Sequence, residues 1–186
     1  MMGEFRNNNP LLMGIVNLSP DSFYYKSRKS SLESLDSGKY KYADIIDVGC
    51  ESSRPGAKPL DENMELDRLI EFVENNSHLS KKVLSIDTYK PRVAKFALNN
   101  GFTMINDIKS GNHDGKMMQL ASDFNCPIVL MHMKGIPETM QDNPCYDNII
   151  DNILMFFEKK IKIADSHGIN LDKIILDPGI GFGKRI

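Results

Sequence analysis

The stretch Lys82-Val83-Leu84-Ser85-Ile86-Asp87-Thr88-Tyr89-Lys90-Pro91 contains the pattern that decides the fold. An apolar run of strand length, residues 82–86, ends at the polar residue Asp87. A segment of helix-forming composition then begins at Lys90. Because the same order recurs along the chain, we expect a repeated unit of strand, polar loop and helix.

Six short apolar runs predict six strands, and most are followed by a segment with helical spacing or composition. The expected strands are residues 11–16, 43–48, 82–86, 102–105, 127–131 and 173–176. The expected helices are residues 31–41, 61–75, 90–99, 115–124 and 146–167. Near-continuous apolar strands that alternate with helices are typical of a parallel sheet buried on both faces, so the predicted class is α/β. No linker divides the chain, and we expect one domain over residues 1–186.

Polar residues stand at or just after the end of every expected strand. They are Asn17, Asp47, Asp87, Asn106, Asp107, His132 and Asp177. In a barrel the carboxyl ends of all strands open on one face, and that face carries the active site. A doubly wound open sheet also binds ligands at strand ends, but usually at one switch point. The distribution over every strand favours the barrel.

Composition narrows the class of partner. The chain has 186 residues, 41% of them hydrophobic, and a formal net charge of −2 without a basic stretch, which argues against nucleic acid or a membrane surface and favours a small-molecule substrate. Cys50, Cys126 and Cys145 have unrelated spacings and are interpreted as reduced thiols. Residues 1–10 are polar, and no apolar segment reaches the roughly 18 residues of a membrane span, so we expect a cytoplasmic location.

Two loops offer groups for a metal and an anion. Residues 17–23 are rich in turn-forming residues, which alone explains them, but the amide oxygen of Asn17 also suits Mg²⁺. In the loop 47–56, Ser52, Ser53 and Arg54 form a set that can bind phosphate oxygens. The alternative is a structural ion pair between Arg54 and a carboxylate of the same loop.

The later loops offer carboxylates, an amide and an aromatic ring. Asp87 and the pair Asn106-Asp107 can be simple helix caps, or can accept hydrogen bonds from a ligand rich in N–H groups, such as a pterin. Met131 can simply fill the core, and His132 has no second histidine at ligand spacing. Residues 177–184 do not match a P-loop, although Phe182 can stack on a flat ring.

In order and spacing, these phrases together resemble dihydropteroate synthases. They are residues 13–23, 47–56, 85–91, 105–108, 130–133 with 139–141, and 176–184. The resemblance implies a (β/α)₈ TIM barrel that joins 7,8-dihydropterin-6-ylmethyl diphosphate to 4-aminobenzoate in folate biosynthesis. It also implies release of pyrophosphate with Mg²⁺, and competition by sulfonamides for the aminobenzoate site.

The resemblance also assigns roles by position. Asn17 would bind the metal, while Ser53 and Arg54 would contact the diphosphate and the aminobenzoate end. Asp87 would be catalytic together with Arg54. The pterin would be bound by Asp87, Asn106 and Asp177, in a pocket lined by Ile108, Met131 and Phe182.

The sequence departs from the family at several places. Cys50 stands where the family has glycine, which would disturb a turn that needs positive φ, and Ser53 replaces a threonine but keeps the hydroxyl. The family continues with two further β/α units after the sixth strand, so we expect a barrel truncated after about six strands, with low stability and little or no activity alone, and a homodimer only if complete. The alternatives are a noncatalytic pterin-binding remnant and a pterin-dependent methyltransferase domain.

Overall fold

A computed structural model describes residues 10–18, 40–52, 56–76, 82–111 and 114–185. Within them, six parallel strands form one sheet in the order in which they occur along the chain. The strands are β1 (Met13–Asn17), β2 (Ile45–Gly49), β3 (Val83–Asp87), β4 (Met104–Asp107), β5 (Ile128–Met131) and β6 (Ile174–Asp177). All six predicted strands are therefore confirmed, with ends that differ by one or two residues.

In the described part of the chain, four α-helices connect or cover these strands. They are α2 (Glu62–Asn75), α3 (Pro91–Asn99), α4 (Lys116–Asp123) and α5 (Ile149–Ser166), and a 3₁₀ turn η3 (Leu171–Lys173) precedes β6. Helix α5 begins three residues later than predicted because the Asn148 side chain accepts hydrogen bonds from the backbone N–H groups of Ile150 and Asp151 and so caps the helix. The predicted helix over residues 31–41 lies almost entirely outside the described residues.

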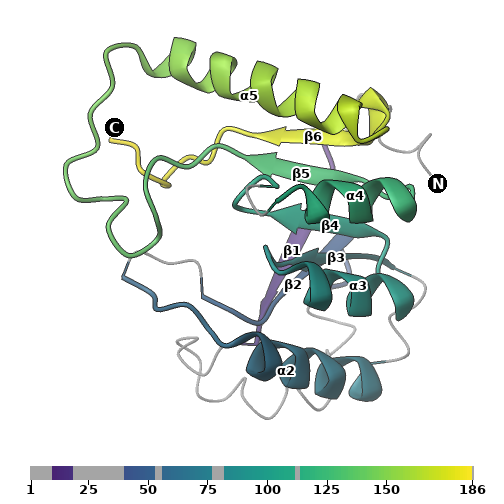
Figure 1. The fold of residues 1–186 in the computed structure, drawn as a ribbon. Coiled ribbons are helices and arrows are strands. Elements are labelled where there is room, and N and C mark those ends of the chain that lie inside the picture. The colour runs from purple at the N-terminus through teal and green to yellow at the C-terminus, as the bar shows by residue number, and fades with distance from the viewer. Residues whose placement is uncertain (1–9, 19–39, 53–55, 77–81, 112–113, 186) are drawn as a thin grey trace.

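The strand order distinguishes the two arrangements considered from the sequence. A doubly wound sheet reverses its strand order at a switch point, whereas this sheet runs from β1 to β6 without reversal. In Figure 1 the sheet curls, α2 to α5 lie along its outer side, and the loops that follow the strands gather at one end. No pairing joins β6 to β1 among the described residues. The α/β class and a barrel that is open after six strands are thus confirmed.

Two separate apolar clusters show which side chains point outward and which point inward. The larger lies between sheet and helices and includes Val48, Ile86 and Leu130. The smaller contains Ile45, Met104 and Val129, with Val83 and Ile175 packed against it. Successive side chains of a strand point to opposite faces, so the smaller cluster is the layer inside the barrel.

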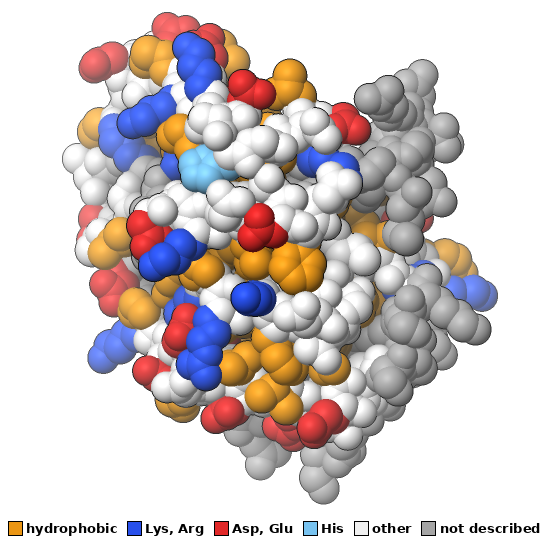
Figure 2. Space-filling model, turned by 45° about the vertical axis from the view of Figure 1, so that its right-hand side comes forward, with side chains coloured by type: hydrophobic (Ala, Val, Ile, Leu, Met, Phe, Trp, Pro, Cys, Tyr) orange, Lys and Arg blue, Asp and Glu red, His pale blue; other side chains and the backbone are white. Residues whose placement is uncertain are grey.

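The remaining general predictions concern thiols, membranes and charge. Cys50 and Cys126 are buried, Cys145 is exposed, and all three are free thiols, as predicted. Cys50 has no positive φ, so the cysteine at this position introduces no backbone strain. None of the described helices is long and apolar enough to cross a membrane. On the face shown in Figure 2, acidic and basic side chains are intermixed.

Candidate active site

The strands direct a set of polar side chains into the barrel. On β2, Ile46 and Val48 pack against the helices, so Asp47 and Gly49 point inward between them. The same alternation directs Ser85 and Asp87 of β3 inward, because Leu84 and Ile86 belong to the outer cluster. Above the inner apolar layer, the barrel is therefore lined by hydrogen-bonding groups at the carboxyl ends of its strands.

A row of residues crosses four neighbouring strands at this end. Asn17 pairs in register with Gly49, Gly49 with Asp87, and Asp87 with Asn106. A Cβ atom added to Gly49 would lie 3.1 Å from Asp87 Oδ2 and 3.5 Å from Asn17 Oδ1. The side chains of Asn17 and Asp87 therefore converge over Gly49, whose missing side chain leaves room for both.

Asp47 lies one step deeper than this row. The Asn106 amide Nδ2 donates to Asp47 Oδ2 over 2.9 Å, and the Asp47 residue is 3% exposed. Burial raises the pKa of Asp47 above its usual value, and Ser85 and Asn106 oppose this rise. Asn106, one of the predicted pterin ligands, is thus held by a buried carboxyl group from a neighbouring part of the barrel.

Asp87 is electrostatically the most perturbed of the predicted site residues. Burial, followed by the charges of Asp47, Glu65 and Asp107, raises the pKa of the Asp87 carboxyl well above 3.8. The N-cap residue of α3 is Lys90, so the alternative interpretation of Asp87 as a simple helix cap is wrong. A carboxyl group whose pKa is raised by burial and by neighbouring carboxylates is a candidate functional group.

Two polar residues that were expected at the same rim have structural roles instead. Asp107 accepts hydrogen bonds from the backbone N–H groups of Lys109 at 2.8 Å and Gly111 at 2.7 Å, so it stabilises the turn after β4. The His132 ring is buried and packs edge-on against Phe156 of α5, with 5.0 Å between the ring centroids. The prediction that these two side chains converge on the rim is wrong, because both make their contacts on the outer side of the barrel.

The last loop brings the remaining predicted pterin residues to the rim. Met131 pairs in register with Asp177, and Asp177 Oδ1 accepts from the Gly179 N–H at 2.7 Å. The Lys184 ammonium group donates to the backbone oxygens of His132, Gly179 and Phe182 over 2.8 to 3.0 Å. This lysine ties the loop that carries Phe182 to the end of β5.

Two apolar residues of the predicted pocket are also buried. Ile108 is 8% exposed and Met131 is 3% exposed, yet neither belongs to the outer or the inner apolar cluster. Ile108 directly follows β4, two residues after Asn106, and Met131 ends β5 in register with Asp177. This position is compatible with the predicted role in lining the pocket.

The sequence did not predict a largely buried ion-pair network that lies beside the polar row. The Lys90 ammonium group contacts Glu51 at 2.5 Å and also pairs with Glu65 of α2. Burial lowers the pKa of Lys90, but the two glutamates outweigh burial and the net change is upward. Glu51 also accepts from the Leu60 N–H at 2.9 Å and from the Tyr89 hydroxyl group at 3.0 Å. The network fixes both described ends of the loop after β2.

The candidate metal and phosphate ligands are only partly described. Ser53 and Arg54 lie outside the described residues. Among the residues that the structure does describe, no group of three or more His, Cys, Asp or Glu side chains could hold a metal ion. Asn17 is exposed and its Oδ1 lies at the rim beside Asp87. One neutral oxygen here suits Mg²⁺ that takes most of its ligands from water and phosphate.

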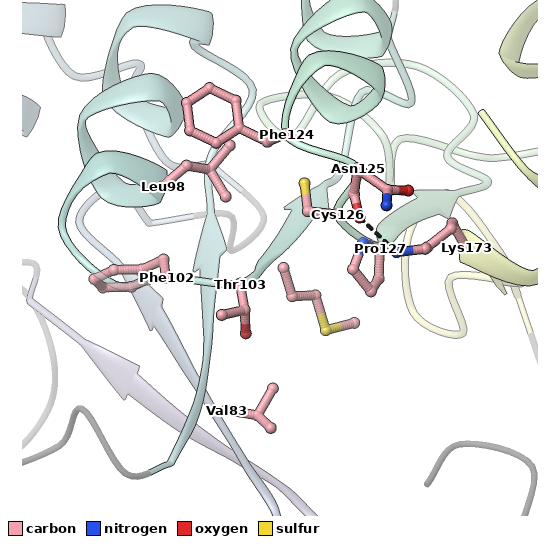
Figure 3. A pocket seen from close by; sticks show the side chains of 10 residues that line it. Val83, Leu98, Phe102, Thr103, Phe124, Asn125, Cys126, Pro127 and Lys173 are labelled. Atoms are coloured by element: carbon pink, nitrogen blue, oxygen red, sulfur yellow. Dashed lines mark hydrogen bonds between the residues drawn. The ribbon is translucent and has the colours of Figure 1, made fainter. Parts of the chain in front are cut away.

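An apolar cavity of about 240 Å³ lies at the opposite, amino-terminal end of the strands. Figure 3 shows the apolar lining, which includes Leu98 near the end of α3, Phe124 directly after α4, and Phe102. Lys173 lies at one side, and its ammonium group donates to the Asn125 backbone oxygen. This cavity contains no carboxylate side chain, so we place the ligand site at the other end.

The fold is a parallel α/β barrel with a polar rim at the carboxyl ends of its strands, the end at which barrels of this kind bind their ligands. The chain belongs to the family described as pterin binding enzymes, which matches residues 13–186. It is 38% identical over 185 residues to the dihydropteroate synthase of Escherichia coli K12, covering 96% of this chain and 64% of that protein.

Comparison with solved structures also finds similarity to dihydropteroate synthases. The chain superposes on the dihydropteroate synthase of Yersinia pestis in complex with a sulfonamide drug with a TM-score of 0.83 and 37% identity, covering 95% of this chain and 65% of the other. For the Xanthomonas albilineans enzyme with 4-aminobenzoic acid, the TM-score is 0.82 and the identity 34%, covering 96% and 64%. The chain therefore spans just under two thirds of the length of each of these three proteins.

Proposed function

We propose that this chain forms the pterin-binding part of a dihydropteroate synthase. The enzyme would join 7,8-dihydropterin-6-ylmethyl diphosphate to 4-aminobenzoate and release pyrophosphate. The observation that carries this proposal is the pairing of Asp87 and Asn106 in register on adjacent strands, with both side chains at the inner rim. The names and bound ligands of the relatives, 4-aminobenzoic acid and a sulfonamide drug, support it.

The rim has the hydrogen-bonding character that a pterin requires. The 2-amino group and the adjacent ring N–H of a pterin present two parallel donors, which one carboxylate can accept together. Asp87 and Asp177 offer carboxylates at the rim, and Asn106 offers an amide between them in strand order. Ile108, Met131 and Phe182 would supply apolar contacts to the flat ring.

The reaction needs positioning and charge stabilisation rather than a protein nucleophile. The bond between the pterin methylene carbon and the diphosphate oxygen breaks, and its electron pair leaves with pyrophosphate. The lone pair of the 4-aminobenzoate nitrogen forms the new bond to that carbon, and the nitrogen loses a proton. Positive charge that develops on the pterin methylene group would be stabilised by the carboxylates of Asp87 and Asp177.

The diphosphate would be neutralised from the other side of the rim. Arg54 and Ser53 are the predicted contacts for its oxygens, and Arg54 is the predicted catalytic cation. Asn17 would hold Mg²⁺, which supplies positive charge to the leaving diphosphate. Asn17 lies close to Asp87, so the metal and pterin sites would be adjacent.

The test measures the release of pyrophosphate by the complete enzyme when both substrates and Mg²⁺ are present. Asp87→Asn should reduce turnover by at least 100-fold, since charge-assisted contacts to the pterin are lost (about 3 kcal/mol). The matched control is Asp123→Asn at the exposed end of α4, which should leave turnover unchanged. Unchanged turnover of the Asp87 variant would contradict the assignment.

Calorimetry with a dihydropterin separates the proposal from its alternatives. Binding of the pterin without release of product would favour a noncatalytic pterin-binding protein. Binding without any effect of 4-aminobenzoate or diphosphate would favour a pterin-dependent methyltransferase. A cytoplasmic location and a homodimer remain predictions from the sequence and the family resemblance.

A further inference from the structure

Asp47 is a buried carboxyl group that the proposed reaction does not use. It stands in the middle of β2 and points into the barrel, because its neighbours Ile46 and Val48 pack against the helices. At 3% exposure it is far more buried than a surface aspartate. Carboxylates are almost never fully buried unless they are paired, so this position calls for an explanation.

The hydrogen bonds of Asp47 are incomplete. Asp47 Oδ2 accepts from the Asn106 amide nitrogen over 2.9 Å. Asp47 Oδ1 and Ser85 Oγ are both buried, and neither makes a hydrogen bond of good geometry among the described residues, although the nearby Ser85 hydroxyl group lowers the pKa of Asp47. Buried polar atoms without partners lower stability. A residue chosen for packing alone would be apolar here, as Ile45 is two positions earlier on the same inner face.

The contact with Asn106 has a direct consequence for a ligand. The Asn106 Nδ2 atom donates to Asp47 Oδ2, so this contact holds the NH₂ end of the amide toward the Asp47 carboxyl group. Asn106 Oδ1 is then left as an acceptor, and no described residue donates to it. Without Asp47 the amide could turn by 180° and present a donor in the same place.

We propose that Asp47 is a positioning residue that fixes the direction of the Asn106 amide and thereby selects a heterocycle that presents N–H donors. This inference rests on the proposed function, since it concerns the pterin site. It adds a determinant of specificity that acts through Asn106, one step behind the rim. The selection is for 2-amino-4-oxopteridines over 2,4-dioxopteridines, which carry a carbonyl oxygen in place of the amino group.

The test compares the affinities of 7,8-dihydropterin and its 2,4-dioxo analogue by calorimetry with the intact protein. Asp47→Ala should reduce the preference for the pterin by roughly 3- to 10-fold, the factor that one neutral hydrogen bond contributes. Asp47→Asn should also reduce it, because an amide can face Asn106 in either orientation, and this variant decides the question if the alanine variant does not fold. The matched control is Ser85→Ala, which removes the hydroxyl group beside Asp47 but leaves the contact between Asp47 and Asn106 intact, so the preference should be unchanged.

Each outcome has one meaning. Equal loss of affinity for both ligands in the Asp47 variants would show a merely structural role and overturn the inference. An unchanged preference would overturn it as well, while the proposed function stands. If the parent protein binds neither ligand, the proposed function itself fails, and the inference fails with it.

Discussion

The glycine at the centre of the polar row provides a sharp test of the site. Gly49→Ala adds one methyl group between two side chains that the proposal assigns to the pterin and to the metal. Its Cβ atom would lie 3.1 Å from Asp87 Oδ2, closer than an ordinary van der Waals contact, and 3.5 Å from Asn17 Oδ1. The Asp87 carboxylate must therefore move by a few tenths of an ångström.

The expected effects on binding and on stability differ in size. Displacing the carboxylate should weaken about one charge-assisted hydrogen bond to the pterin, or roughly 1.5 to 3 kcal/mol, which is about 10- to 150-fold in the dissociation constant. The overpacking cost of roughly 1 kcal/mol should be largely offset by the reduced freedom of the unfolded chain, a gain of about 0.4 to 1 kcal/mol. Calorimetric titration with a dihydropterin and thermal unfolding measure the two quantities.

A second glycine gives the opposite pattern and serves as the control. Gly14 of β1 points to the outer side, where an added Cβ atom would lie 2.9 Å from the Tyr40 ring and 3.1 Å from Ala43 Cβ. Gly14→Ala should therefore reduce the melting temperature while the affinity for the pterin is kept. If Gly49→Ala binds the pterin as tightly as the parent, the ligand does not depend on the row over Gly49, and the reasoning is refuted.

Three further predictions concern charge and metal. Asp87→Asn should raise the free energy of unfolding near pH 7, because the raised pKa of Asp87 makes ionisation of this carboxyl group destabilising above pH 3.8. Thermal unfolding measured over a series of pH values should show that this gain in stability disappears at lower pH. Lys90→Met should reduce the free energy of unfolding by about 3 kcal/mol in urea, because the buried Glu65 and the partly buried Glu51 lose their shared partner. The exposed Lys95→Met should change it by less than about 0.5 kcal/mol. Asn17→Ala should increase the Mg²⁺ concentration needed for half-maximal pyrophosphate release without changing the melting temperature, and an unaltered Mg²⁺ dependence would remove Asn17 from the metal site.

The sequence predicted the strands well because each one is a compact apolar run with a polar residue at its end. It could not show which polar residues point inward. Strands buried on both faces lack the alternation that marks an inner and an outer side, and a shift of one residue reverses the direction of a side chain. Asn106 and Asp107 illustrate this, since the first faces the barrel and the second stabilises the outer turn.

The sequence alone also could not predict contacts between residues that lie far apart along the chain. Lys90 pairs with Glu51 across 39 positions and with Glu65 across 25. Nothing in the local sequence around Lys90 distinguishes it from an ordinary lysine at the start of a helix.

The uninterrupted strand order has a consequence for how the protein is made. Each strand pairs with those next to it in sequence, so each strand pair spans a single β/α unit and needs no later part of the chain to form. Asn17, Gly49, Asp87 and Asn106 come from the first four strands. The part of the candidate ligand-binding rim that these four residues form is complete once β4 has been synthesised. We therefore expect it to fold while the ribosome is still adding later residues.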